Sequence, residues 1–76
     1  MTITVTQEHI KVGVPFSKWG CAVALAAYQR LGPCYVGETA IVLLKDNQVF
    51  HLPPVAQLWI QRFDRGLPVE PFSFDV

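Results

Sequence analysis

The stretch that decides the fold reads Cys21-Ala22-Val23-Ala24-Leu25-Ala26-Ala27-Tyr28, and it contains no charged side chain. Alanine and leucine are strong helix formers. The pair Gly32-Pro33 follows, which is the usual C′ glycine with a helix breaker behind it. Because Ser17 is a good N-cap, the sequence predicts a helix from Lys18 to Leu31. Polar residues occur only near its ends, so the helix is apolar nearly all round.

The apolar character of this helix has a consequence for assembly. A helix that is apolar on every side is buried on every side. In a chain of 76 residues, one sheet and one further helix can hardly cover it. Exposed apolar surfaces of this size usually mark association. We therefore predict a homo-oligomer whose interface is formed by Ala22, Leu25, Ala26 and Tyr28. The alternative is that alanine, as a strong helix former, tolerates partial exposure.

The rest of the chain reads as short strands and helices. Alternating apolar and polar residues predict a strand near the N-terminus, and the tail places Phe72, Phe74 and Val76 on one face. The fold class that follows is α+β in a single domain of residues 1–76. It has four to five short, mainly antiparallel strands, with one long and one medium helix on one face. The predicted strands are Thr2–Thr6, Cys34–Val36, Thr39–Leu44, Gln48–Leu52 and the tail Val69–Val76; the other helical segments are Gln7–Val12 and Pro54–Arg65.

Composition and charge exclude several classes of protein. Apolar residues make up 51% of the chain, which rules out a disordered tail. Six basic and six acidic side chains give no net charge, so non-specific nucleic-acid binding is not expected. The N-terminus has no signal-peptide pattern. The longest apolar run, Trp19–Tyr28, is about half the length that spans a bilayer. We expect a cytoplasmic protein with no membrane partner.

The two cysteines are the first candidates for chemistry. Cys21 and Cys34 form no CxxC motif and have no histidine at a ligand spacing, so we predict two free thiols and no metal site. Cys21 lies in the first turn of the predicted helix, where the helix dipole would lower its thiol pKa. A nucleophile also needs a base, and nothing in the sequence brings His9 or His51 to it. We predict small core filling for Cys21, no catalytic residue, no cofactor and no enzymatic activity; the alternative is that Cys21 is the reactive thiol of a cysteine enzyme.

A candidate ligand site lies at the start of the long helix. Free amides at a helix N-terminus attract anions, and Lys18 adds positive charge. The ring of Trp19 could stack on a base. We predict a pocket for a phosphate-bearing ligand. Its residues are Ser17, Lys18 and Trp19, with Arg62 and Arg65 from the second helix. The alternative is an N-cap serine beside a core tryptophan, with the arginines on a solvated helix face.

Four blocks of the sequence carry a resemblance that covers almost the whole chain. They are Ile3–Ile10, Cys21–Ala26, Phe63–Gly66 and Val69–Phe74. In this order they resemble a group of short hypothetical proteins of bacteriophages and some bacteria, with the pattern I-x-V-T-x-x-H-I, C-P-V-A-L-A and F-D-x-G-x-x-V-x-P-F-x-F. The chain departs from the pattern at Ala22, where proline is frequent.

The resemblance transfers no catalytic residue and implies a phage or bacterial origin. Small phage proteins of this kind often act by binding, including sequestration of nucleotide signals and blocking of host proteins. We therefore predict a non-enzymatic binding protein in the host cytoplasm that acts as a homo-oligomer on a host or defence factor. That factor is either a protein or a phosphate-containing small molecule such as a signalling nucleotide. The alternative is a structural or assembly module that docks another protein through its apolar helix.

Overall fold

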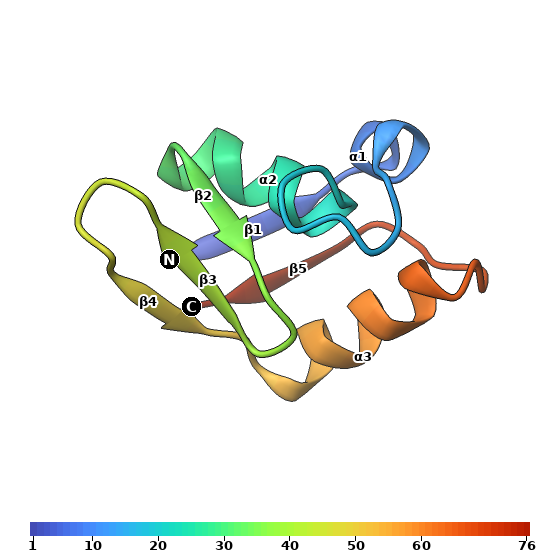
Figure 1. The fold of residues 1–76 in the computed structure, drawn as a ribbon. Helices are drawn as coiled ribbons and strands as arrows, with labels where there is room; N and C mark the ends of the chain where they lie inside the picture. The colour runs from blue at the N-terminus through green and yellow to red at the C-terminus, as the bar shows by residue number, and fades with distance from the viewer.

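The chain forms five strands and three helices, which a computed structural model describes for residues 1–76 (Figure 1). All strand pairs are antiparallel, and they make a two-stranded sheet, β1-β5, and a three-stranded sheet, β2-β3-β4. The predicted α+β class is confirmed. No helix has the length and apolar character needed to cross a membrane. The elements are β1 (Thr2–Val5), α1 (Gln7–Val12), α2 (Ala22–Leu31), β2 (Cys34–Val36), β3 (Ala40–Leu43), β4 (Val49–His51), α3 (Pro54–Asp64) and β5 (Phe72–Asp75).

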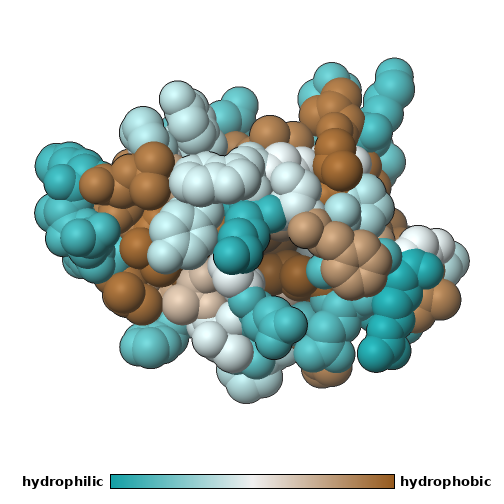
Figure 2. Space-filling model, in the orientation of Figure 1, coloured by the Kyte–Doolittle hydropathy of each residue, from teal (hydrophilic) through white to brown (hydrophobic).

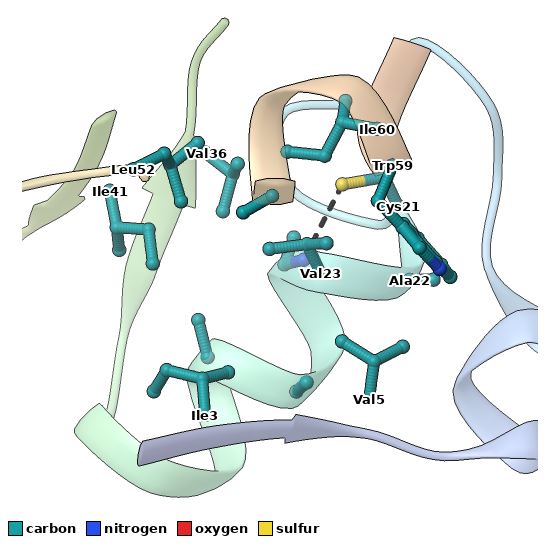
Figure 3. Close-up of a cluster of buried hydrophobic side chains, with 14 of the residues drawn as sticks. Ile3, Val5, Cys21, Ala22, Val23, Val36, Ile41, Leu52, Trp59 and Ile60 are labelled. Carbon is teal, nitrogen blue, oxygen red and sulfur yellow. Dashed lines mark hydrogen bonds between the residues drawn. The ribbon is translucent and has the colours of Figure 1, made fainter. Parts of the chain in front are cut away.

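The apolar helix α2 is the centre of the fold. It contacts β1 on one side and both β2 and β3 on another, so the two sheets cover different faces of one helix. Figure 3 shows Val23 of α2 amid this core. Ile3 comes from β1, Ile41 from β3 and Ile60 from α3. All of these side chains belong to one buried cluster.

Most of the residues predicted to form an oligomer interface on α2 are buried within the chain itself or partly buried. The expectation that one chain cannot cover most of the helix is wrong, because β1 contacts it on one side, β2 and β3 contact it on another, and α1 also packs against it. Ala22 is 0% exposed and Ala26 is 2% exposed, so neither is available to a partner. Leu25 is partly buried. Of the four predicted interface residues, only Tyr28 is largely exposed, at 58%.

The two-stranded sheet joins the ends of the chain. Ile3 lies opposite Phe74 in the register, and both side chains point into the core. The outward row is polar, and the hydroxyl of Thr2 donates to a carboxylate oxygen of Asp75 at 2.6 Å. Phe72 stacks on Trp59 of α3 with a centroid distance of 4.8 Å. The inward face predicted for the tail is therefore confirmed, and it attaches α3 to the sheet.

The long helix begins later than the sequence predicts. Its first residue is Ala22 and its N-cap is Cys21, whereas Ser17 caps a separate turn by accepting from the amide of Gly20 at 2.9 Å. Two backbone carbonyls between Ser17 and Ala22 accept hydrogen bonds from other segments of the chain. Lys18 O accepts from the amide of Val36 at 2.9 Å, and Gly20 O accepts from the amide of Val14 at 2.8 Å. Neither carbonyl accepts the i+4 amide that would continue the helix toward Ser17.

The short helix α1 is attached to α2 through a buried histidine. Nδ1 of His9 accepts from the backbone amide of Thr6 at 3.0 Å. The proton of the neutral ring therefore lies on Nε2, which donates to Oε1 of Gln29 at 2.7 Å. The side chain of His9 is buried, which the sequence did not indicate.

We expect His9→Ala to lower the free energy of unfolding by about 1–3 kcal/mol, because the change leaves polar partners in a part-buried site without their hydrogen bonds. Urea denaturation followed by circular dichroism measures this. The matched control is His51→Ala on β4, where the side chain is exposed, and its effect should stay within about 0.5 kcal/mol. Equal effects of the two substitutions would contradict the structural role of His9.

Candidate functional site

A cleft of about 570 Å³ opens between α3, the turn before α2 and the connection from β2 to β3. Its volume falls within the range of small-ligand sites, about 300–1,000 Å³. Figure 2 shows a hollow near the centre of this face, with brown apolar atoms at its base and teal polar side chains around it. The residues that line the cleft are Phe16, Ser17, Lys18, Cys21, Val36, Gly37, Glu38, Thr39, Gln57, Ile60, Gln61, Asp64 and Arg65.

One wall of the cleft is a single face of α3 that extends just past its C-terminus. Gln57, Ile60, Gln61, Asp64 and Arg65 follow one another at spacings that bring side chains to the same side of a helix. Ile60 is buried, so the apolar base of the cleft continues into the core. The wall therefore presents two amides, one carboxylate and one guanidinium beside an apolar base.

The opposite wall is held in place by backbone hydrogen bonds. The amide of Phe16 donates to Oδ1 of Asp64 at 2.9 Å, which joins the turn to α3. The bond from Val36 to Lys18 joins the same turn to β2. Phe16 has a φ of 62°, a conformation that non-glycine residues rarely adopt. Its side chain is 77% exposed at the edge of the cleft.

The structure brings together three of the five predicted ligand residues. Ser17, Lys18 and Arg65 line the cleft. The ring of Trp19 instead packs on Tyr35 with a centroid distance of 5.4 Å. Arg62 points elsewhere and donates through Nη2 to the carbonyl of Pro68 at 3.0 Å.

The anion site expected at the helix N-terminus is not formed by these residues. The helix begins at Ala22, which is fully buried, so Lys18 does not lie in its first turn.

The sequence did not indicate five polar residues of the cleft as site residues. They are Glu38, Thr39, Gln57, Gln61 and Asp64. The spacing of the two glutamines by one helical turn is a signal in the sequence, but nothing local indicates which surface they face. Lys18 and Arg65 are balanced by Glu38 and Asp64, so the cleft has no formal surplus of positive charge.

Cys21 lies at the base of the cleft as a buried thiol. Burial raises its pKa, and the hydrogen bond from the amide of Ala24 to Sγ opposes this only in part. The expected lowering of the pKa by the helix dipole is therefore wrong. The ring nitrogens of His9 bond to Thr6 and Gln29 instead. Burial also raises the pKa of Cys34, and both cysteines are free thiols, as predicted.

Comparisons with protein families, with curated proteins and with solved structures give no significant match for this chain.

The raised thiol pKa values predict a loss of stability at alkaline pH. Above the ordinary value of 9.0, the unfolded chain loses the protons of Cys21 and Cys34 while the folded chain keeps them, so ionisation favours unfolding. Below that value both states hold the protons and the effect disappears. We expect the free energy of unfolding from urea titrations to fall between neutral pH and about pH 10.

The matched control is the double variant Cys21→Ala, Cys34→Ala. Between neutral pH and about pH 10, the free energy of unfolding of the double variant should fall by less than that of the wild type. Parallel losses in the two proteins would show that the thiols do not cause the effect.

Proposed function

We propose that the chain is a non-enzymatic binding protein that holds its partner in this cleft. The observation that carries the proposal is the combination of an apolar base with polar walls of both charges in a volume suited to a ligand. Lys18 on one wall, and Gln61 and Arg65 on the other, supply hydrogen-bond donors among the residues that line the cleft. The buried Cys21 supports a packing role for the thiol, since its raised pKa disfavours the thiolate that a nucleophile needs.

The identity of the partner is proposed on different grounds. The resemblance of the sequence to short phage and bacterial proteins supports a host or defence factor, met in the host cytoplasm. Such a factor would be a protein or a small molecule. The chain would act by binding the factor and so keeping it from its other partners. The cleft supplies a place for either class of partner.

Native mass spectrometry of protein purified gently from its expression host tests the cleft as the binding site. We expect the wild type to carry extra mass from a retained partner, and Gln61→Trp to lose that mass because the larger ring fills the cleft. The control is Leu58→Trp, an exposed position on α3 that does not line the cleft, and it should keep the mass. A bare chain throughout, or extra mass that persists in Gln61→Trp, would count against the cleft.

A second candidate, self-association or docking of another protein, is favoured by the outer face of the three-stranded sheet. Tyr35, Val42 and Val49 are cross-strand neighbours on that face, and Trp19 packs on Tyr35. Trp19 is 60% exposed and Val49 is 48% exposed. Contiguous exposed apolar residues of this kind often mark protein association. We therefore propose that a homo-oligomer interface lies on this face of the sheet and not on α2.

Sedimentation velocity distinguishes an interface on the outer face of the three-stranded sheet from an interface on α2. We expect Val49→Lys to lower the mass of the assembly, because a charge would be buried between apolar faces. Tyr28→Glu on α2 should leave the mass unchanged. Dissociation by Tyr28→Glu alone would return the interface to the helix, and a wild type that is monomeric at all concentrations would reject the homo-oligomer.

A further inference from the structure

We infer that the occupant of the cleft is a short extended segment of a polypeptide. The inference rests on the proposed function of the cleft and names its ligand class. Four features of the lining residues support it: the length of the wall, the two glutamine amides, the charge balance and the apolar base.

The length of the helical wall fits a few extended residues. From Gln57 to Arg65 the chain advances about 12 Å along the helix axis, at 1.5 Å per residue. An extended chain advances about 3.3 Å per residue. The wall therefore runs beside about four residues of an extended segment.

The glutamine side chains match the hydrogen-bonding groups of a peptide. Nε2 of Gln57 donates to the carbonyl of Leu52 at 2.8 Å, which fixes the side chain and leaves Oε1 as an acceptor. One helical turn further on, the exposed amide of Gln61 offers both a donor and an acceptor. A peptide has alternating N–H and C=O groups that use both kinds of partner. A phosphate group offers acceptors almost alone and would leave the amide oxygens without a partner.

The charges of the cleft disfavour a phosphate group and suit a polypeptide. Lys18 and Arg65 would attract a phosphate, but Glu38 and Asp64 line the same cleft and would repel it. Complementary charges of both signs are usual where one protein surface recognises another. A segment with one acidic and one basic side chain would suit this cleft. Its acidic group would face Lys18 and Arg65, and its basic group would face Glu38 and Asp64.

The apolar base supplies a place for an anchoring side chain. Cys21, Val36 and Ile60 are buried residues whose atoms reach the cleft. At its edge lies the exposed ring of Phe16, whose backbone amide donates to Asp64. A buried apolar contact surrounded by polar groups is the usual arrangement of a binding hot spot. We therefore expect one leucine-sized or aromatic side chain of the segment to enter the base.

Titration of the ¹⁵N-labelled chain followed by NMR tests the inference with three probes. The first is a set of blocked tetrapeptides, each with one acidic, one basic and one leucine or phenylalanine residue. The others are inorganic phosphate and adenosine monophosphate. We expect the tetrapeptides to shift the amide signals of Gly37, Glu38, Gln61 and Asp64 and to leave Thr4 on β1 unaffected. The two phosphate probes should shift none of these signals.

A variant of similar size tests the role of the amide. Gln61→Met removes both the donor and the acceptor, and we expect it to weaken binding of the best tetrapeptide roughly tenfold. Leu58→Met, on the same helix outside the cleft, should bind as the wild type does. Equal binding by Gln61→Met and the wild type would overturn the assigned amide contact.

The outcomes separate this inference from the proposed function. If adenosine monophosphate or phosphate shifts the cleft amides and the tetrapeptides do not, the cleft binds a ligand but the polypeptide assignment is wrong. If no probe shifts the cleft amides, both the inference and the proposed binding site fail.

Discussion

The constraint on which the whole structure depends is that a chain of 76 residues must bury most of the apolar side chains of α2. The hydrophobic effect makes an uncovered apolar helix costly in water. The chain meets this constraint by dividing its strands between two sheets. The strands from the two termini, β1 and β5, pair on one side of the helix, and β2, β3 and β4 form the other sheet. The aromatic face of α3 then packs on β5 through Trp59 and Phe72.

The small side chains of α2 allow close packing of the segments around it. Ala22 and Ala27 are fully buried, and alanine adds little thickness between a helix and a sheet. At Gly13, which follows α1, a Cβ would lie 2.7 Å from the amide nitrogen of Ala22 and from the carbonyl oxygen of His9. Real Cβ atoms do not approach backbone atoms so closely. The junction of α1 and α2 therefore requires glycine for its lack of a side chain.

The cleft is a consequence of how the segment before α2 is held. Because Lys18 and Gly20 give their carbonyls to Val36 and Val14, this segment leaves the helix axis and reaches across toward α3. Its contact with Asp64 leaves a gap between the turn and the polar face of α3. The same departure from the helix directs Trp19 onto Tyr35. One local break thus creates the cleft and adds to the apolar outer face of the sheet.

The sequence by itself determined the fold class, the end of α2 at Gly32, the position of α3 and the inward face of β5. Caps, breakers and alternation act between near neighbours in the chain, so they can be read locally. Only the tertiary structure decided where α2 begins, that Ala22 and Ala26 are core residues, and which polar residues share the cleft. These features depend on contacts between residues far apart in the chain. An apolar helix has the same sequence pattern whether a partner or its own two sheets cover it.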